Sequence, residues 1–280
     1  MSTQPRLLAL VPARAGSKRV RDKNVRPLAG HPLLAYTIAA ARASGAFGAV
    51  VLSTDSELYA CVGRHYGAEV PFLRPPELAT DTSPDIDWVE HALAQLHEAG
   101  RDFDAFSILR PTSPFRLPET IRRARSAFLA CEEADSLRAV EKCAQHPAKM
   151  WVQWGALIRP LVPLELQEAV FGSRQQAAPW HSSQYQALPE VFVQNASLEI
   201  AWSRVVFEGR TIAGNAVLPF FTAGHEGFDV NHPSDWRRAE ELVASGEQAL
   251  PQIAESPFQM SDDCAGVSGP AAPDLLVKGE

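Results

Sequence analysis

The chain has 280 residues and a mass of 30.5 kDa; 46% of its residues are hydrophobic and 21% are charged. This length can hold one large domain with a substantial core, and this balance excludes disordered, collagen-like and coiled-coil proteins. The net charge of −7 argues against nucleic acid as a partner. No apolar run approaches the roughly 20 residues that span a bilayer, and the N-terminus lacks a signal-peptide pattern. With four widely spaced cysteines and no CxxC pair, we expect a cytoplasmic protein without a membrane or nucleic-acid partner.

Apolar runs and helical patterns alternate through the first 135 residues. The wholly apolar run Leu7–Val11 is typical of a strand buried on both faces of a parallel sheet. A helical pattern then begins at Pro32 and ends at Gly45. The same alternation predicts strands at 49–52, in a third run that ends near 71–73, and at 105–109, and helices at 57–65, 84–96 and 118–128. This order predicts βαβ units in an open parallel sheet, which is an α/β fold.

From about Val140 the regular pattern is lost. Residues 140–190 carry several prolines and tryptophans without a clean period, so we interpret them as an insertion: a subdomain, a lid or an oligomer contact. Strand patterns return at 191–193 and 197–202, and a last helix is predicted from Ser234 to Ala244. We expect residues 1–250 to form the domain and residues 251–280, rich in Pro, Gly, Ser and Asp, to form a disordered tail.

A basic loop follows the first predicted strand, from Pro12 to Gly30. Between Arg14 and Arg26 it holds six Lys or Arg residues against one Asp, a local charge of +5 in an acidic chain. Ligands of open α/β sheets bind at the carboxyl ends of the strands, where this loop lies, and small residues such as Gly16 let backbone N–H groups approach an anion. The loop therefore suits a triphosphate; a basic loop that only faces water is the alternative. The patterns GxxxxGK[ST] and GxGxxG do not occur, which argues against a Walker loop and a Rossmann dehydrogenase.

Four motifs, in order along the chain, carry a resemblance to a known family. They are Pro12-Ala13-Arg14-x-Gly16-Ser17-Lys18-Arg19 followed by Lys23-Asn24, then Ser53-Thr54-Asp55, Arg74–Asp81 and Pro111–Arg116. In order and spacing they resemble the CMP-sialic acid synthetases, or acylneuraminate cytidylyltransferases, and the likeness extends from about Leu7 to Leu242. The resemblance implies a nucleotide-diphospho-sugar transferase-like (Rossmann-like) open sheet. It also implies that the insertion at about 140–190 is a dimerisation subdomain and that the protein is a homodimer.

The resemblance assigns the basic loop to the nucleotide, which it implies is CTP. Lys and Arg side chains would withdraw charge from the phosphates while an acceptor oxygen attacks the α-phosphorus and pyrophosphate leaves, because such transfer depends mostly on positioning and electrostatics. On this basis the predicted catalytic residues are Arg14, Lys18, Lys23 and Asp229. The residues predicted to bind the nucleotide are Ala13, Arg14, Gly16, Ser17, Lys23, Asn24, Arg74 and Ser83.

A late acidic motif, Gly227–Trp236, resembles the family's metal site, which has two aspartates one residue apart. Side chains two residues apart on a strand point the same way, so such a pair can share one Mg²⁺ ion. Here the pair is Asp229 and Asn231, and the asparagine supplies a neutral oxygen. We therefore predict Mg²⁺ as the cofactor, with Asp229 as the principal ligand and Asn231 as the second. Asp235 is predicted to cap or open the last helix.

The acceptor pocket departs most from the family pattern. Arg110 stands where the family has glutamine before Pro-Thr-Ser-Pro, and a guanidinium binds a carboxylate or a phosphonate equally well. We expect an anionic acceptor, first of all a sialic-acid-like nonulosonate; the alternatives are a small phosphonate acceptor and a non-catalytic nucleotide-binding paralogue. Thr112 and Ser113 are equally well explained as turn residues between two prolines. The predicted acceptor-binding residues are Arg110, Thr112, Ser113, Lys149, Arg174, Gln194 and Asn195.

Overall fold

Buried strands alternate with helices in the computed structural model, which describes residues 4–163, 166 and 179–259. The described helices are α1 (Leu33–Ser44), α2 (Glu57–His65), α3 (Asp85–Glu98), α4 (Pro118–Ala130), α6 (Arg204–Gly209) and α7 (Pro233–Ala244). The described strands are β1 (Leu7–Pro12), β2 (Pro27–Leu28), β3 (His31–Pro32), β4 (Ala49–Ser53), β5 (Ala105–Ile108), β6 (Ser136–Lys142), β7 (Trp151–Trp154), β8 (Leu157–Pro160), β9 (Phe192–Trp202) and β10 (Val217–Phe221). Short 3₁₀ turns η1 (Pro76–Leu78), η2 (Pro147–Lys149), η3 (Trp180–Ser182) and η4 (Tyr185–Ala187) connect some of them.

The central sheet has six strands among the described residues, in the order β10-β6-β9-β5-β1-β4. Strand β1 runs parallel to β4 and to β5, but β5 pairs antiparallel with β9. The α/β architecture and the parallel pairing of the strands predicted in the first 135 residues are therefore confirmed. The sheet as a whole is nevertheless mixed, because an apolar run shows that a strand is buried and not which way it runs. No helix of the described residues has both the length and the apolar character needed to cross a membrane.

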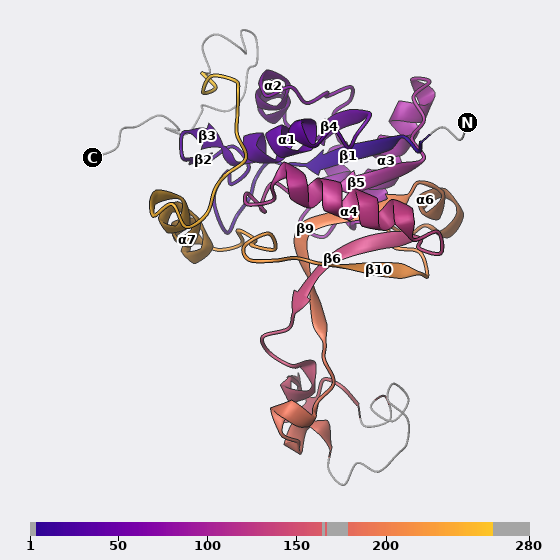
Figure 1. Ribbon diagram of the computed structural model, residues 1–280, viewed down its shortest axis with the longest axis vertical. Coiled ribbons are helices and arrows are strands. Elements are labelled where there is room, and N and C mark those ends of the chain that lie inside the picture. The colour runs from indigo at the N-terminus through magenta and orange to yellow at the C-terminus, as the bar shows by residue number, and fades with distance from the viewer. Residues whose placement is uncertain (1–3, 164–165, 167–178, 260–280) are drawn as a thin grey trace. The chain divides into compact units, whose positions relative to one another are not determined.

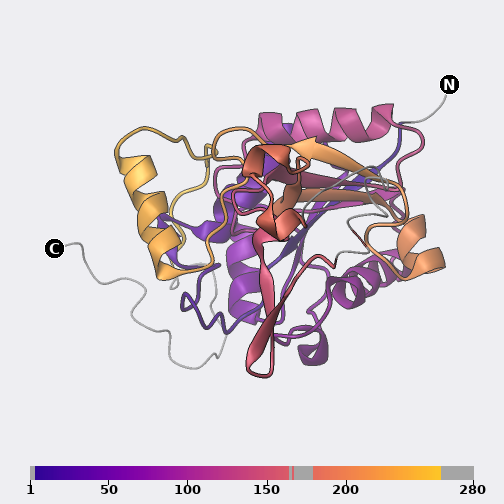
Figure 2. The same cartoon turned by 90° about the horizontal axis from the view of Figure 1, so that it is seen from below.

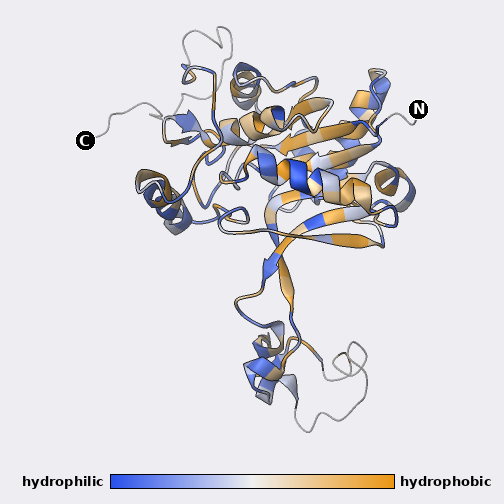
Figure 3. Cartoon of the chain, in the orientation of Figure 1, coloured by the Kyte–Doolittle hydropathy of each residue, from blue (hydrophilic) through white to orange (hydrophobic). Residues whose placement is uncertain are grey.

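Each buried strand supplies the cores on both faces of the sheet. On β1, Leu7, Ala9 and Val11 join one hydrophobic cluster, while Leu8 and Leu10 join another, as the period of two in a strand requires. Side chains of α1, α2 and α4 contribute to the first cluster, and those of α3 and α6 to the second. The views from two directions show helices on both sides of the sheet (Figure 1, Figure 2). Hydrophobic residues gather along the central strands (Figure 3).

The predicted helices of the first half form, and their ends follow the expected signals. Helix α1 ends where Gly45 adopts a φ of 63°, a left-handed cap that glycine allows at little cost. The predicted third run, which ends near 71–73, forms no full strand among the described residues, because Pro71 has no N–H to give to a ladder and residues 71–73 are largely exposed. The strand contact there is a single bridge between Val51 and Glu69.

The described residues divide into two compact units, one formed by residues up to Ala139 and from Asn195, the other by Val140–Gln194. The boundaries fall inside β6 and β9. The second unit contains the antiparallel hairpin β7–β8, in which Trp151 pairs with Pro160, and the turns η2, η3 and η4. Many of its large apolar side chains are exposed: Met150, Trp151, Val152, Trp154, Leu157, Ile158, Leu161, Tyr185, Phe192 and Val193.

Residues 251–259 pack on the first unit instead of forming part of a disordered tail. Glu255 pairs with Arg42 at 2.5 Å, and the Phe258 N–H donates to the Tyr66 hydroxyl at 3.1 Å. The side chain of Ile253 also packs against the core. The prediction for these residues is wrong because two apolar side chains anchor a segment whose composition is otherwise polar. The rest of the predicted tail, 260–280, lies outside the described residues.

Candidate active site

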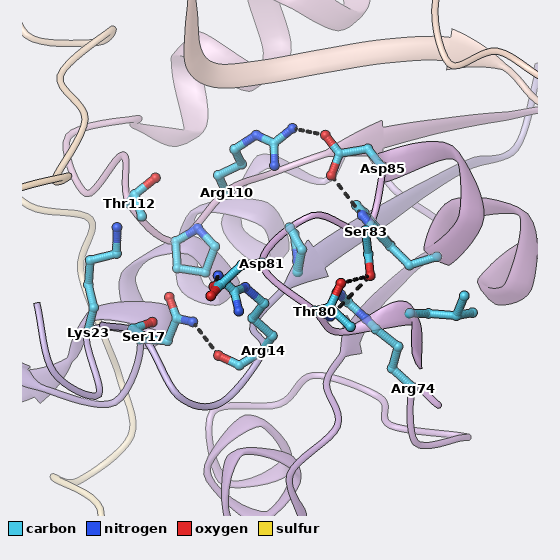
Figure 4. Close-up of a pocket in the computed structure, with 15 residues that line it drawn as sticks. Arg14, Ser17, Lys23, Arg74, Thr80, Asp81, Ser83, Asp85, Arg110 and Thr112 are labelled. Carbon is cyan, nitrogen blue, oxygen red and sulfur yellow. Dashed lines mark hydrogen bonds and ion pairs between the residues drawn. The ribbon is translucent and has the colours of Figure 1, made fainter. Parts of the chain in front are cut away.

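A cleft of about 240 Å³ lies where β1 and β5 end (Figure 4). Most of the residues predicted to bind the nucleotide line it, together with the start of the predicted acceptor motif. The lining residues are Pro12, Arg14, Ser17, Lys23, Asn24, Arg74, Leu78, Thr80, Asp81, Ser83, Asp85, Trp88, Arg110, Pro111 and Thr112. The sheet brings these residues together because the carboxyl ends of parallel strands meet at one edge.

The basic loop is held in shape by side chains that satisfy its backbone. The Ala15 N–H donates to Asp55 Oδ1 at 2.8 Å, and the buried Asn24 donates through Nδ2 to the Arg14 carbonyl at 3.2 Å. Gly16 has a φ of 72°, and a Cβ built on it would meet nothing within 4 Å. The two hydrogen bonds therefore hold the loop in one conformation, while the backbone at Gly16 stays uncovered. This geometry allows an anion to approach the backbone closely.

Two of the predicted phosphate-binding cations share one carboxylate. Asp81, three residues after η1, accepts from Arg14 Nη2 and from Lys18 Nζ, both at 2.5 Å. The hydrogen bonds from Lys18 and Arg14 hold the pKa of Asp81 below its usual value. The side chain of Lys18 is 80% exposed and that of Arg14 35%. In this structure Asp81 therefore occupies the position at which an anionic ligand would meet these cations.

Lys23 lies deeper than the other lysine of the loop. Its Nζ donates to the Val230 carbonyl, and the Val230 N–H donates to the Thr112 carbonyl at 2.9 Å. Burial lowers the pKa of Lys23, Asp229 nearby raises it in part, and Arg19 lowers it further. A half-buried ammonium that has no direct carboxylate partner among the described residues is poised to bind an entering anion.

Arg74 forms part of the floor of the cleft, with only 4% of its surface exposed. It donates to Ser53 through Nε at 3.0 Å and through Nη2 at 2.8 Å, and it lies 4.8 Å above the Trp88 ring. Burial lowers its pKa to about 10. Ser83, which also lines the cleft, donates to the Glu77 carbonyl at 2.9 Å and accepts from the Thr80 N–H at 3.1 Å, so it stabilises its own loop.

Asp229 and Asn231 form a polar pair joined to the cleft wall through Val230. Asp229 Oδ2 accepts from Asn231 Nδ2 at 2.5 Å, while Asp229 Oδ1 is buried and has no hydrogen-bond partner within the described part of the chain. A buried carboxylate oxygen without a partner is costly unless something else satisfies it. No group of three or more His, Cys, Asp or Glu residues in the described ranges has the geometry of a metal site. The pair nevertheless fits Mg²⁺, which is usually held by one or two carboxylates together with substrate phosphates and water.

Arg110 and Thr112 line the cleft, whereas Ser113 does not. The Ser113 side chain is buried beside the turn, and its hydroxyl has no partner among the described residues. The fully buried Arg116, the last residue of that motif, donates to the Arg110 carbonyl at 3.3 Å and to Thr37 Oγ1 at 2.9 Å. Arg116 thus fixes the turn that presents Arg110.

The remaining predicted acceptor residues lie elsewhere. Lys149 is in the second unit, where its Nζ donates to the His181 carbonyl at 3.0 Å and the Ser183 carbonyl at 2.6 Å. Gln194 is exposed at the edge of that unit. Asn195 donates to Thr222 Oγ1 at 2.8 Å and does not line the cleft. Arg174 lies outside the described residues.

Three acidic residues near the cleft were not singled out from the sequence. Asp81 and Asp85 line it, and Glu199 on β9 contacts Arg110 at 3.0 Å. Asp81 is the last residue of the third motif, Arg74–Asp81, so a signal for it was present in the sequence. Glu199 had none, because only the pairing of β9 with β5 brings it close.

Known proteins resemble this chain over most of its length. The sequence model of the family described as "Cytidylyltransferase" matches residues 8–189. CMP-N,N'-diacetyllegionaminic acid synthase of Legionella pneumophila is 34% identical over 253 residues, which is 88% of this chain and 99% of that protein. N-acylneuraminate cytidylyltransferase of Escherichia coli is 38% identical over 156 residues, 56% of this chain but only 34% of that protein. In fold, the chain is similar to CMP:2-keto-3-deoxy-manno-octonic acid synthetase complexed with CTP, with a TM-score of 0.62 at 12% identity; the match covers 86% of this chain and 99% of that one.

A mixed α/β sheet with a cationic cleft at its strand ends is suited to binding a phosphate-bearing ligand. The family match over residues 8–189 identifies the class of enzyme as the cytidylyltransferases. The chain belongs to the cytidylyltransferase family and is a CTP-dependent nucleotidyltransferase, which confirms the resemblance carried by its motifs.

Proposed function

We propose that this chain transfers CMP from CTP to a nonulosonic acid and releases pyrophosphate. The observation that carries the proposal is the convergence of Arg14, Lys23 and Arg74 on one cleft beyond β1. The names of the relatives, which make CMP-activated diacetyllegionaminic acid and act on N-acylneuraminate, support the acceptor class.

In the proposed reaction an acceptor hydroxyl oxygen bonds to the α-phosphorus of CTP while the bond from that phosphorus to the pyrophosphate oxygen breaks. The hydroxyl proton passes to solvent water, and negative charge builds up on the leaving pyrophosphate. Arg14, Lys18 and Lys23 would face this charge and stabilise it more strongly than the ground state. For Arg14 and Lys18 to do so, they must exchange the carboxylate of Asp81 for phosphate oxygens. Lys23 has no carboxylate partner to give up within the part of the chain that the structure describes.

We propose Asp229 and Asn231 as the residues that hold Mg²⁺. When bound, Mg²⁺ would neutralise phosphate charge and orient the triphosphate. The buried, unpartnered Oδ1 of Asp229 supports this assignment. The Asn231 amide now donates to Asp229, and rotation of the amide by half a turn would present its oxygen instead.

We propose Arg110 and Thr112 as the acceptor side of the cleft, with Ser83 and Arg74 on the nucleotide side. The predicted phosphonate alternative rests on the positive charge of Arg110. Asp85 and Glu199 both contact that guanidinium, at 2.5 Å and 3.0 Å, and this pairing favours the nonulosonate over the phosphonate. Lys149, Gln194, Asn195, Ser113 and Arg174 remain acceptor-side candidates on the family resemblance alone.

We also propose that the protein is a homodimer held together by the second unit. The two exposed tryptophans of β7, Trp151 and Trp154, and the exposed apolar side chains of β8 together give more apolar surface than singly scattered side chains would. A cytoplasmic location agrees with an enzyme that consumes CTP.

Pyrophosphate release tests the proposal directly. The protein is incubated with CTP, Mg²⁺ and one acceptor at a time: N,N'-diacetyllegionaminate, N-acetylneuraminate or a small phosphonate. We expect pyrophosphate with at least one nonulosonate, with formation of the CMP product, and little with the phosphonate. Tight CTP binding with no turnover of any acceptor would instead favour a non-catalytic nucleotide-binding protein.

A further inference from the structure

The guanidinium of Arg110 is held by only one of its terminal nitrogens. Nη2 donates to Asp85 Oδ2 at 2.5 Å and to Glu199 Oε1 at 3.0 Å. Asp85 is the first residue of α3, and Glu199 lies on β9 opposite Ile108 of β5. Two elements that are distant in sequence therefore fix the same nitrogen.

Glu199 also belongs to a second ion pair. Its other carboxylate oxygen contacts Arg138 of β6, which donates to the Ile212 carbonyl at 2.9 Å. The side chains of Glu199 and Arg138 are only 5% and 10% exposed. With Arg110 and Asp85 included, the cluster contains two guanidinium groups and two carboxylates, and its formal charges cancel. A guanidinium in such a cluster offers hydrogen-bond donors to the cleft but little net positive charge.

The remaining donors of Arg110 are open. Of the five N–H groups of a guanidinium, two belong to Nη2; Nε and Nη1 have no acceptor within the described ranges. Arg110 lines the cleft, and its free terminal nitrogen turns away from Asp85, toward the side where Arg14 and Asp81 lie (Figure 4). One edge of the side chain is thus anchored, and the other edge faces the space for ligand.

We propose that Asp85 and Glu199 are positioning residues for acceptor recognition, which hold Arg110 by Nη2 and cancel its charge so that its free edge donates to a neutral oxygen of the acceptor. That oxygen would be a hydroxyl or an amide carbonyl, both of which a nonulosonic acid carries. The inference rests on the proposed function and deepens it. It assigns Arg110 the hydrogen-bonding role of a neutral amide and leaves the acceptor carboxylate to other groups.

The test is a double-mutant cycle on Arg110→Gln and Asp85→Asn, with N,N'-diacetyllegionaminate and CTP as substrates. Asparagine keeps an oxygen for the Trp88 Nε1–H, which now donates to Asp85 Oδ1 at 2.8 Å, but it replaces Oδ2, the oxygen that accepts from Arg110, with an NH₂ group that cannot accept. We expect Arg110→Gln to raise the acceptor KM about fivefold, the size of one neutral hydrogen bond, and to leave the CTP KM within about twofold. Asp85→Asn should raise the acceptor KM about threefold, and the double variant should match Arg110→Gln alone, because a positioning residue has no effect once its target is gone.

The salt dependence of the acceptor KM tests the charge. The cluster is neutral in the wild type and again in the Arg110→Gln/Asp85→Asn double variant, so these two proteins should show the same dependence on NaCl concentration. Asp87→Asn is the matched control: it removes the same charge from the same turn of α3, but Asp87 faces Arg210 at 3.8 Å, and we expect no change in KM. Additive effects of the two substitutions, or a weaker salt dependence in the double variant than in the wild type, would overturn the inference while the proposed function survives. A wild type that turns over neither N,N'-diacetyllegionaminate nor N-acetylneuraminate would overturn both.

Discussion

Among the cations of the cleft, Lys23 has the setting that best suits direct contact with the phosphates. It is half-buried and donates to a backbone carbonyl, whereas Lys18 is 80% exposed and paired with Asp81. Lys23→Ala should therefore lower kcat at saturating CTP and acceptor by about 100-fold, the loss typical of one preorganised charge in a transition state. Pyrophosphate release measures it. Lys18→Ala is the matched control and should cost clearly less; equal losses would contradict the special role of Lys23.

Asp81 holds Arg14 and Lys18 where an anion would otherwise bind, so it competes with the triphosphate. Asp81→Asn should lower the KM for CTP about threefold to tenfold at low ionic strength, and the gain should shrink as salt screens these exposed charges. Steady-state kinetics at two NaCl concentrations measures it. The control is Asp102→Asn, which removes an exposed carboxylate paired with His97 instead. A higher KM in Asp81→Asn would mean that Asp81 orients the cations and does not compete.

Single residues were predictable where a motif fixes them to a strand end. Arg14, Lys23 and Arg74 line the cleft as the motifs imply. The partners of these residues were not predictable, because they depend on tertiary contacts: Glu199 is 89 residues from Arg110 in sequence. Similarly, the acidic motif predicted Asp229 but could not show that one of its oxygens lacks a partner.

At the scale of elements, the cap at the start of α7 stabilises that helix and also contacts Asn231 of the proposed metal pair. Asp235 accepts from the backbone N–H groups of Asn231 and His232, at 2.9 Å and 2.7 Å, which confirms its predicted capping role. Asp235→Ala should cost about 1 kcal/mol of unfolding free energy and lower the thermal midpoint by about 2–4 °C. Thermal unfolding followed by circular dichroism measures it. Ser234→Ala is the control, since the Ser234 hydroxyl contacts only Asp235, at 3.4 Å.

The same cap has a defined pH dependence. Although burial opposes the shift, hydrogen bonds from the Asn231 and His232 N–H groups leave the pKa of Asp235 lower than usual. Its stabilisation should therefore be complete above the ordinary aspartate pKa and fade as the pH falls through the lowered value in the folded state. The difference in midpoint between wild type and Asp235→Ala should accordingly shrink on acidification. A difference that stays constant down to acid pH would show that the carboxylate charge is not what stabilises the cap.

The sequence patterns predicted those elements whose residues are all buried in the same way or whose ends carry a clear signal. Strands β1, β4 and β5 are buried on both faces and largely apolar, and the helices that follow them carry clear starts and ends. Strand β6 was missed because Arg138 interrupts its apolar pattern, and β10 because it contains Pro219 and alternates between exposed and buried residues. The direction of β9 also had no local signal. Hydrophobic periodicity cannot predict a strand in which a buried charged side chain is paired with a residue distant in sequence, as Arg138 is with Glu199.

At the scale of the whole molecule, the regular hydrophobic pattern ends near Val140, and the burial of large apolar side chains changes at the same point. In the first unit, large apolar side chains form three buried clusters. In the second, β7 and β8 expose most of theirs, so a short hairpin here is stabilised by little core of its own. Apolar surface of this kind is typical of a contact with another chain, which is the basis of the proposed homodimer.

A charge placed on that hairpin tests the homodimer. The Trp154 side chain is 64% exposed, and an aromatic residue at the centre of a contact contributes strongly to its affinity. Trp154→Lys should convert the protein from dimer to monomer in sedimentation equilibrium, while circular dichroism remains that of a folded α/β protein. Phe207→Lys is the matched control: Phe207 is 55% exposed on α6, in the first unit, and its replacement should leave the dimer intact. A wild type that sediments as a monomer, or a Trp154→Lys variant that stays dimeric, would mean that the second unit does not hold two chains together, and its exposed tryptophans would then need another partner.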